Sequence, residues 1–519
     1  MESENRETCA LEAPIFRGMD LDPDACYRAI QTRDARFDGR LFTAVRTTGI
    51  YCRPICPART PKRENVVFYP SAAAAQAAGF RPCLRCRPET SPDLGAWLGA
   101  SATVGRALRL IEAGALDEAD VDALAGRLGV GERQLRRLFR QHLGASPVAV
   151  AQTRRVLLAK QLIHETRLPM ADVALAAGFG SVRRFNETFH QLYERPPRAL
   201  RRSRGPDEPA AGAVTLKLAY RAPYDWDAML GFLAPRAIPG VETLDRGAYA
   251  RTIRIGSGTG AISVRPAAGD RLAVTVAFPT LTALPAIIAR VRRVFDLAAD
   301  PAAIGAHLAE DPALEPLVAA RPGLRVPGAW DGFEMAVRAV LGQQITVAAA
   351  IGLAGRLARE HGDRLEAALP GFPGLTHVFP SPEQLARADL ASLPMPRARS
   401  KALEALAKAA ADDPTLFSPR GELAQSIARL RALPGIGEWT AQYIAMRQLR
   451  EPDAFPAADI GLLRALADEA GVRPTPAAVL ARSERWRPWR AYAAQHLWAA
   501  DLASARPIKE KTDANRKAA

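Results

Sequence analysis

The stretch Leu430–Asp459, LRALPGIGEWTAQYIAMRQLREPDAFPAAD, decides the fold of the C-terminal part of this chain. Its centre, Pro434–Gly437, is a tight hairpin in which the glycines Gly435 and Gly437 can adopt positive φ. A helical pattern follows at once, so the hairpin amides at the helix N-terminus would bind a phosphate through main chain, without sequence preference. Downstream, a Phe-Pro-Ala-Ala break leaves one carboxylate, Asp459, immediately before a second apolar helix.

The hairpin, the aspartate and an aromatic-rich tail occur in the order found in the helix-hairpin-helix DNA glycosylases, which this part of the chain resembles. Two further segments, Tyr224–Leu233 and Ala320–Gly328, resemble the N-terminal domain of the AlkA-type 3-methyladenine glycosylases. The resemblance covers about Val214–Leu502. It implies that Asp459 is catalytic and stabilises an oxocarbenium-like transition state, or orients water against it.

Four aromatic residues are expected to form a base pocket, because an enzyme acting on a base must take it out of the helical stack. Trp439 and Tyr443 stand four residues apart, so they share one face of the helix after the hairpin. With Trp498 and Phe232 they match the aromatic residues of the AlkA pocket. Aromatic faces attract an electron-poor, cationic alkylated base. The alternative for these residues is ordinary core packing.

Three positions depart from patterns of related glycosylases. Lyases of this superfamily carry a lysine two residues after the last hairpin glycine, where this chain has Trp439. Without an amine there, a Schiff base is not expected, so the resemblance implies a monofunctional hydrolase. Gln344 stands where the AlkA type has a leucine that wedges into the gap left by the flipped base. Gly461 stands where the family has a leucine near the pocket, which leaves the pocket width open.

Four of the six cysteines form two close pairs, C-x3-C and C-x2-C, and all six precede residue 87. The pairs are Cys52 with Cys56 and Cys83 with Cys86. Four thiolates so spaced suit one tetrahedral zinc ion, and in a reducing compartment they indicate metal ligands rather than disulfides. Cys9 and Cys26 lack such a partner and are expected to be ordinary small apolar residues.

The sequence around these cysteines is more specific than the cysteines themselves. The segments Ala44–Pro54, Arg63–Tyr69 and Ala78–Cys83 closely resemble the N-terminal domain of the Ada alkylation-response family. The resemblance implies that zinc-bound Cys52 accepts a methyl group from a DNA methylphosphotriester, which makes the zinc both structural and catalytic. Residues placed for phosphate contact are Thr48, Arg53 and Arg59. The alternative is a purely structural zinc knuckle. No cysteine follows Cys86, so the chain lacks the thiol of that family's second methyltransferase domain.

Residues 121–140 are predicted to form helix, glycine-containing turn and helix, and residues 170–189 repeat the arrangement. With the GF…F…F…P spacing of the second unit, the two resemble the AraC-type DNA-binding domain. The resemblance implies that the second helix of each unit enters a major groove. Side chains expected to reach bases or phosphates are Glu132, Arg133, Arg136, Arg137, Ser181, Arg183, Arg184 and Asn186. The alternative is a pair of helical hairpins that does not bind DNA.

The chain has 519 residues and a formal net charge of +15. Residues 1–205 hold 32 Lys and Arg against 22 Asp and Glu, so the basic excess is concentrated there. Nucleic acid is therefore the expected partner. The resemblances imply double-stranded, alkylated and operator DNA, and also RNA polymerase. No signal peptide and no apolar run long enough to cross a bilayer is evident, so we expect a cytoplasmic, nucleoid-associated protein without a membrane partner.

We expect a multidomain fold, mainly α with α+β parts. After a loose N-terminal tail, the expected parts are a small zinc-bound α/β domain over 16–90, an all-α double helix-turn-helix domain over 94–203, a linker over 204–212, an α+β antiparallel-sheet domain over 213–325, an all-α helix-hairpin-helix glycosylase domain over 326–506 and a basic tail over 507–519. The leading hypothesis is a methyl-sensing transcriptional activator fused to an alkylbase N-glycosylase. The alternatives are a regulator whose glycosylase-like domain is catalytically silent, and an enzyme whose N-terminal half only delivers it to DNA.

Overall fold

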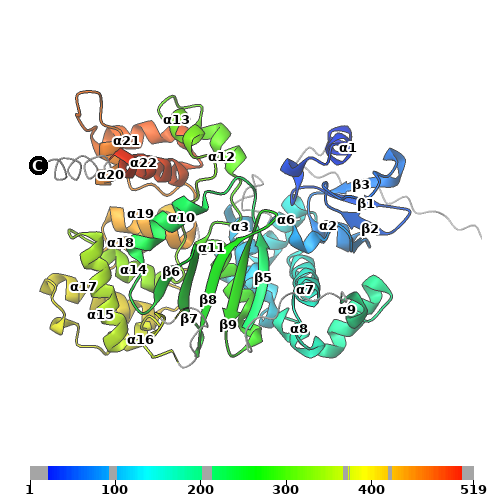
Figure 1. The fold of residues 1–519 in the computed structure, drawn as a ribbon, viewed down its shortest axis with the longest axis horizontal. Helices are drawn as coiled ribbons and strands as arrows, with labels where there is room; N and C mark the ends of the chain where they lie inside the picture. Colours follow the sequence, from blue (N-terminus) through cyan, green and yellow to red (C-terminus); the bar gives the residue numbers. More distant parts are fainter. Residues whose placement is uncertain are drawn as a thin grey trace, which may run out of the picture.

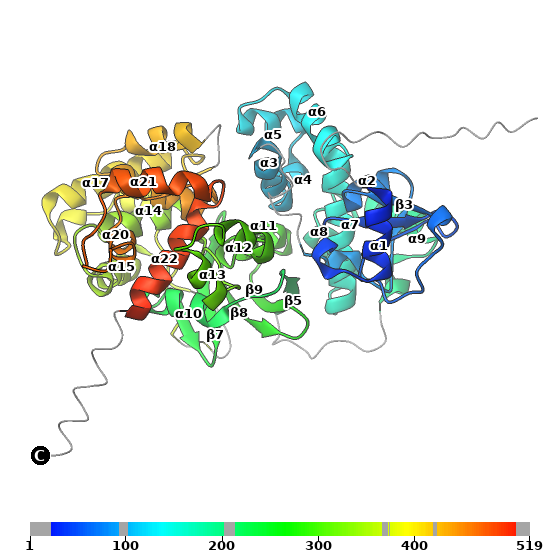
Figure 2. The same ribbon diagram turned by 90° about the horizontal axis from the view of Figure 1, so that it is seen from above.

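The computed structural model describes residues 22–92, 102–201, 213–365, 372, 374–418 and 423–504. The expected multidomain, mainly α architecture is confirmed. In Figure 1 the zinc-domain strands and the helix-turn-helix elements form one end of the molecule, and the five-stranded sheet with the later helices forms the other. Figure 2 shows α3, α5 and α6 rising beside the sheet domain. The expected terminal tails and the linker over 204–212 lie outside the described residues.

The first part of the chain, residues 22–92, holds a four-stranded sheet in the order β3-β1-β2-β4. β1 pairs antiparallel with β2 and β3, whereas β2 and β4 run parallel. The alanine-rich helix α2 packs on this sheet, where Ala72 and Ala75 meet Phe42 and Tyr51. The elements are α1 (Pro23–Gln31), β1 (Phe42–Val45), β2 (Ile50–Cys52), β3 (Val66–Tyr69), α2 (Ala72–Ala77), β4 (Arg81–Pro82) and the short helix η3 (Pro88–Thr90).

Residues 102–201 form the two predicted helix-turn-helix units, joined by the long helix α7. In the first unit the apolar spacing predicts five inward-facing residues, Leu124, Leu128, Leu135, Leu138 and Phe139. All are buried together except Leu138, which is partly buried against them. In the second unit, Phe179, Phe185, Phe189 and Tyr193 form a ladder of ring contacts. The helices are α3 (Ala102–Glu112), α4 (Ala115–Glu118), α5 (Val121–Leu128), α6 (Glu132–Leu143), α7 (Pro147–Glu165), α8 (Met170–Ala176) and α9 (Val182–Tyr193).

An antiparallel sheet in the order β5-β9-β8-β7-β6 begins the second half. Alternating apolar residues at 214–220, 252–255, 261–264 and 271–278 predict four of its strands. The fifth strand, β6, is not predicted, because its four residues, Glu-Thr-Leu-Asp, contain two acids and one apolar side chain and therefore show no apolar alternation. The elements are β5 (Ala213–Ala219), α10 (Trp226–Leu233), the short helix η5 (Ala234–Arg236), β6 (Glu242–Asp245), β7 (Ala248–Ile255), β8 (Gly258–Ala267), β9 (Arg271–Ala277), α11 (Leu284–Val294), α12 (Pro301–Leu308) and α13 (Glu315–Ala320).

The remaining described residues, up to 504, form a helical lobe around one large core, in which Trp486 is fully buried. The helix predicted after the hairpin is present, but it changes to π-helical geometry at η8. The elements are α14 (Gly332–Leu341), α15 (Val347–His361), α16 (Pro382–Ala386), α17 (Arg397–Asp412), α18 (Leu423–Arg431), α19 (Glu438–Ile444), η8 (Ala445–Leu449), α20 (Ile460–Ala465), α21 (Pro476–Ser483) and α22 (Arg490–Ser504).

Helix α7 joins the regulator-like and glycosylase-like halves by docking against the edge strand of the sheet. The edge strand β5 packs against α7 (Figure 1), and Lys217 of this strand bonds to the helix through its main chain. Its N–H donates to Glu165 Oε2 at 3.0 Å, and its C=O accepts from Gln161 Nε2 at 3.0 Å. Farther along, Arg106 of α3 pairs with Glu451 at 3.1 Å. The unpaired N–H and C=O groups of an edge strand can pair with strands of other chains. The bonds from α7 occupy the N–H and C=O of Lys217 and so prevent such pairing there.

Candidate active site and metal centre

The hairpin lies where the sequence predicts it, but of its two glycines Gly435 alone adopts the expected positive φ. It connects α18 to α19, and Gly435 adopts φ +80°, while Gly437 caps α19 at φ −84°. A Cβ at Gly435 would lie 2.5 Å from Ala402 Cβ, so both conformation and space require glycine there. Both glycines are exposed, which places main-chain amides at the surface at the N-terminus of α19. This arrangement suits a phosphate.

The loop that carries Gln344 is fixed to this hairpin. Gln343 donates from Nε2 to the Gly435 carbonyl at 2.8 Å, and its own carbonyl accepts from Arg399. Gln344 adopts φ +58° and its side chain is exposed. A left-handed conformation is unusual for a residue with a side chain, and such residues gather at functional sites. Gln344 thus projects from a loop whose position is set by its neighbour Gln343, a residue that the sequence did not single out.

Asp459 lies at the N-cap of α20, where four N–H donors surround its carboxylate. Oδ1 accepts from Gly461 N at 2.8 Å and Leu462 N at 3.2 Å. Oδ1 also accepts from Trp498 Nε1 at 2.8 Å. Oδ2 accepts from Trp439 Nε1 at 2.8 Å. The two indoles and the helix end therefore orient one half-buried anion beside the aromatic cluster, which a simple capping residue does not require.

Three of the four predicted pocket aromatics form one cluster. The rings of Trp439 and Tyr443 stack with centroids 5.0 Å apart, and Trp498 meets Tyr443 edge-on at 6.3 Å. Phe232 comes from α10 in the sheet domain and is not in ring contact with them. All four are half-buried rather than fully buried. A base inserted between Trp439 and Tyr443 would need about 7 Å, two contact distances, so it must stack on an outer face or displace one ring.

At Gly461 the main chain comes close to the carboxylate of Asp459. A Cβ there would lie 3.1 Å from both Asp459 Oδ1 and Trp498 Cδ1. A leucine at this position would press on the two residues that define the site. The glycine therefore permits the short hydrogen bond from its own N–H to Asp459. It also leaves the space beside Asp459 and Trp498 that a leucine side chain would fill.

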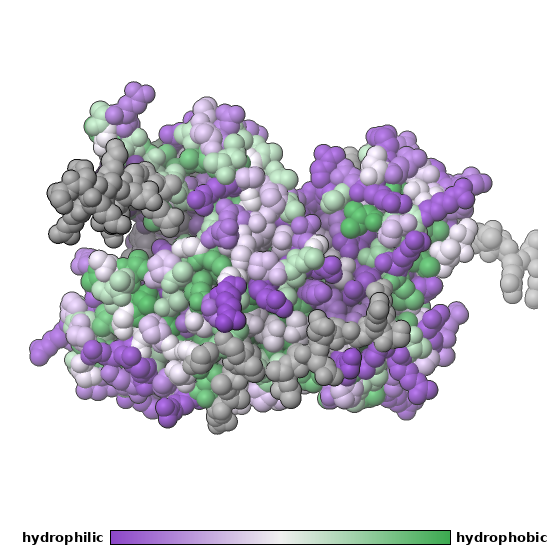
Figure 3. Space-filling model, viewed as in Figure 1, coloured by the Kyte–Doolittle hydropathy of each residue, from purple (hydrophilic) through white to green (hydrophobic). Residues whose placement is uncertain are grey.

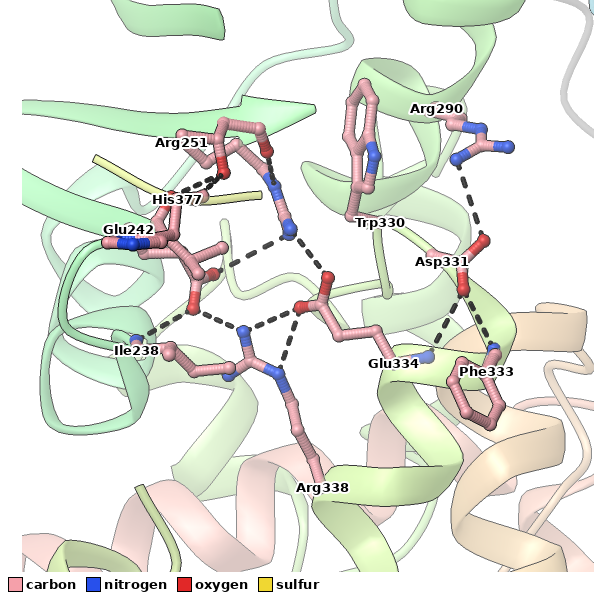
Figure 4. A network of polar contacts seen from close by, with 12 residues as sticks. Ile238, Glu242, Arg251, Arg290, Trp330, Asp331, Phe333, Glu334, Arg338 and His377 are labelled. Carbon is pink, nitrogen blue, oxygen red and sulfur yellow. Dashed lines mark hydrogen bonds and ion pairs between the residues drawn. The ribbon is translucent and has the colours of Figure 1, made fainter. Parts of the chain in front are cut away.

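A buried ionic network, drawn in Figure 4, joins the sheet domain to α14 of the helical lobe. Glu334 accepts from Arg251 at 2.6 Å and from Arg338 at 2.7 Å, and Arg338 also pairs with Glu242. Burial raises the pKa of Glu334, but the two arginines outweigh burial and lower that pKa to about 2. The network therefore fixes how the two lobes meet.

The same network positions Phe232. Arg338 donates from Nη1 to the Arg236 carbonyl at 2.7 Å, and the Arg236 guanidinium lies 4.0 Å from the Phe232 ring centroid. From the other lobe, the Arg447 guanidinium lies 4.3 Å from the same ring and donates to the Tyr443 hydroxyl at 2.9 Å. Phe232 thus reaches the aromatic cluster through Arg447, a second residue that the sequence did not single out.

The four predicted zinc ligands lie together. The Sγ atoms of the four residues all lie within 4.8 Å of one another. These residues are Cys52, Cys56, Cys83 and Cys86. The main-chain amide of Arg53 donates to Cys86 Sγ at 3.4 Å, and that of Arg85 donates to Cys83 Sγ at 3.3 Å. Four clustered sulfurs that accept N–H bonds fit a tetrahedral thiolate zinc site. Cys83 and Cys86 are buried, whereas Cys52 and Cys56 are partly exposed.

Cys26, the one further cysteine among the described residues, lies apart from this cluster. Cys26 is buried against Leu41 in a separate apolar cluster, where burial raises the pKa of its thiol to about 11. It is therefore the small apolar residue that the sequence predicts. Cys9 lies outside the described residues.

The three residues expected to contact phosphate in the zinc domain have different surroundings. Thr48, in the β1–β2 turn, and Arg59 are exposed. Arg53 is nearly buried, pairs with Asp38 and donates to Thr90 Oγ1 at 2.7 Å. Its guanidinium is therefore engaged within the domain, while its main chain supports the sulfur cluster.

The candidate base-reading residues lie on the outer faces of α6 and α9. Arg133 and Arg137 are exposed, and Arg136 pairs with Glu132 at 2.5 Å. On α9, Arg184 is exposed and Arg183 pairs with Glu187 at 2.7 Å; Asn186 is exposed as well. Ser181 caps α9 by accepting from the Arg184 amide at 3.2 Å. Figure 3 shows hydrophilic residues over much of the end of the molecule formed by the zinc and helix-turn-helix domains.

Four family models match consecutive parts of the chain. They are the metal binding domain of Ada at residues 25–89, a helix-turn-helix domain at 124–203, the AlkA N-terminal domain at 215–331 and the HhH-GPD superfamily base excision DNA repair protein at 337–491. A relative from Mycobacterium tuberculosis, named a probable bifunctional transcriptional activator/DNA repair enzyme AlkA, is 46% identical over 92% of this chain and 96% of its own length. This chain belongs to the bifunctional AlkA family.

Shorter relatives match the two halves of this bifunctional AlkA family member separately. DNA-3-methyladenine glycosylase 2 of Escherichia coli is 39% identical over 54% of this chain and 95% of its own length. The bifunctional transcriptional activator/DNA repair enzyme Ada of Escherichia coli is 41% identical over 31% of this chain and 43% of its own length. Among the described residues, no helix combines the length and the apolar character needed to span a membrane.

Proposed function

We propose that the C-terminal half hydrolyses the N-glycosidic bond of alkylated bases such as 3-methyladenine in double-stranded DNA. The carboxylate of Asp459, oriented by Trp439 and Trp498 beside an aromatic cluster, carries this proposal. The bond to the base breaks with its electrons leaving on the base, and the anion of Asp459 stabilises the sugar cation that remains. Water then adds to the sugar carbon and loses a proton.

The enzyme is monofunctional in this proposal. Schiff-base chemistry needs an amine at the sugar, and the indole of Trp439, occupied with Asp459, stands where a lyase has its lysine. Gly435 and Gly437 bind a phosphate by main chain, and Gln344 fills the space left by the extruded base. The base itself stacks on the cluster of Trp439, Tyr443 and Trp498, with Phe232 at its far side.

We further propose that the N-terminal half is a methylphosphotriester-responsive transcriptional regulator. Zinc bound by the four cysteines keeps their thiols deprotonated near neutral pH. The partly exposed Cys52 sulfur attacks the methyl carbon of the phosphotriester. A sulfur–carbon bond forms, the carbon–oxygen bond breaks and the phosphodiester leaves with the electron pair. Thr48 and Arg59 contact the backbone, α6 and α9 read operator DNA, and RNA polymerase is the partner of the bound regulator near the nucleoid.

A base-release assay on duplexes carrying single alkylated or deaminated bases tests the enzymatic half. The purified full chain is expected to release 3-methyladenine and leave an abasic site without strand cleavage. Absence of release from the whole panel would favour the competing regulator-only function. Promoter footprinting with the same preparation tests the regulatory half, and a chain that protects no operator would be an enzyme only.

A further inference from the structure

The side chain of Gln343 lies where three parts of the proposed glycosylase site meet. It belongs to the loop between α14 and α15, which also carries Gln344. Its Nε2 donates to the Gly435 carbonyl at 2.8 Å and to Thr440 Oγ1 at 3.3 Å. Gly435 is part of the hairpin, and Thr440 is buried in α19 directly after Trp439 of the aromatic cluster. One amide group therefore connects this loop to both the hairpin and the helix of the base pocket.

The main chain of the same residue is anchored to a further helix. The Gln343 carbonyl accepts from the guanidinium of Arg399 in α17, a charge-assisted hydrogen bond, and the Gln343 amide donates to the Val340 carbonyl at 3.3 Å. Helix α17 in turn packs on the hairpin, since a Cβ at Gly435 would lie 2.5 Å from Ala402 Cβ. The loop, the hairpin and α17 therefore contact one another in every pairing, which makes them one rigid unit.

This unit holds Gln344 in a backbone conformation that a residue with a side chain disfavours. Gln344 has φ +58°, in the left-handed region, and its side chain is exposed. Such a conformation persists only where the surrounding structure imposes it. The bonds of Gln343 fix the chain on one side of Gln344. On the other side Thr346 caps α15, because its Oγ1 accepts from the Ala349 amide at 3.2 Å.

We propose that Gln343 is a positioning residue that couples phosphate binding at the hairpin to the insertion of Gln344 into the base stack. The inference rests on the proposed glycosylase function and deepens it. Once the hairpin amides bind a phosphate, the rigid unit presents Gln344 to the duplex in a fixed direction from that phosphate. A glutamine side chain loses more rotamer freedom on ordering than a leucine does. A glutamine that enters the stack therefore gains more from a backbone that is already oriented.

A double-mutant cycle tests the coupling in the full chain. The single-turnover release rate of 3-methyladenine at saturating protein is measured for wild type, Gln343→Met, Gln344→Ala and the double variant. Methionine keeps the length of the side chain but removes the amide donor. Gln343→Met is expected to lower the rate at least about tenfold in wild type and less than about twofold in Gln344→Ala, because it acts through Gln344. The proposal is overturned if the two losses multiply, or if either single variant keeps the wild-type rate.

The protein concentration that gives half the maximal rate separates positioning from general damage to the site. The hairpin amides remain in Gln343→Met, so this concentration is expected to stay within about twofold of the wild-type value. A variant that loses only this apparent affinity, at an unchanged maximal rate, contradicts the proposal. Gln31→Met makes the same substitution at the exposed end of α1 and should match wild type in both quantities.

Arg399→Met tests the same coupling from α17 and replaces the first variant if Gln343→Met does not fold. It removes the bond to the Gln343 carbonyl and leaves both glutamines in place. The release rate is expected to fall at least about threefold in wild type and to change less than about twofold in Gln344→Ala. An equal loss in both backgrounds would show that the anchor acts independently of Gln344, against the proposal. A wild-type protein that releases no base would instead reject the proposed glycosylase function.

Discussion

Lys160 of α7 donates a hydrogen bond to Glu89 of the zinc domain at 2.8 Å, and both side chains are fully buried. Lys160 also donates to the carbonyl of the sulfur-cluster residue Cys83 at 2.7 Å. Burial raises the pKa of Glu89, but hydrogen bonding to His164 and the charge of Lys160 outweigh it and lower that pKa to about 2. One lysine thus connects the helix between the two helix-turn-helix units to the metal centre.

Lys160→Met is expected to uncouple these two domains. The apolar side chain keeps the length but leaves Glu89 buried beside fewer cations, a change that costs about 3 kcal/mol or more. Hydrogen exchange of α7 and η3 amides should accelerate in the variant, while one zinc is still bound per chain. Lys62→Met, at an exposed lysine, is the matched control. Unchanged exchange in Lys160→Met would show that the pair does not hold the domains together.

Asp459→Asn is expected to abolish base excision while leaving DNA binding largely intact. The amide loses the charge that the cationic transition state needs, worth roughly 3 kcal/mol or more. It also places an N–H2 group where the two indoles donate. Single-turnover release of 3-methyladenine and duplex affinity measure the two effects separately. Asp412→Asn, at an exposed aspartate of the same lobe, should match wild type. If the Asp459 variant released 3-methyladenine at the wild-type rate, Asp459 would not be the catalytic residue.

No covalent DNA adduct is expected when the enzyme is treated with borohydride during base release. Residues 430–459 contain no lysine, and Trp439 occupies the position of the lyase amine. A glycosylase with lyase activity, run in parallel, should be trapped under the same conditions. A trapped peptide that maps to this segment would overturn the monofunctional proposal.

Methylation of Cys52 is expected to tighten operator binding. Zinc with four thiolates carries a net charge of −2, and conversion of one thiolate to a thioether leaves −1. Loss of one negative charge near phosphates is worth on the order of 1 kcal/mol at surface dielectric. Operator affinity is measured before and after exposure to methylphosphotriester DNA, with Cys52→Ser as the control. Equal affinity in both states would leave the cluster with a structural role only.

Glu334→Gln should destabilise the junction between the sheet domain and the helical lobe. Against the effect of burial, Arg251 and Arg338 hold the pKa of Glu334 below its ordinary value of 4.5, so its carboxylate stabilises the folded state above about pH 4.5. That contribution is lost as the pH falls from about 4.5 to about 2, because both states then bind the proton. The thermal unfolding temperature of the variant should therefore be lower than that of wild type at neutral pH. The two unfolding temperatures should become equal in acid. Glu404→Gln, at an exposed glutamate of α17, should follow wild type at every pH.

The sequence alone determined the features that short-range physics encodes. The hairpin around Gly435 needs positive φ, the two cysteine pairs need only close spacing, and Trp439 and Tyr443 meet because they are four residues apart. Alternating apolar residues likewise predicted four of the five strands of the larger sheet. Each of these follows from residues near one another in the chain, so one sequence suffices.

Tertiary structure decided what depends on distant partners. Trp498 reaches Asp459 across 39 residues, and Glu89 meets Lys160 across 71. In sequence, a buried arginine such as Arg447 is indistinguishable from an exposed one, and Arg53 looked free for phosphate although folding pairs it with Asp38. The physical reason is that burial and charge pairing are set by which elements pack together. Local residue spacing predicts which face of an element is buried, but not which distant element covers that face or which charges pair across elements.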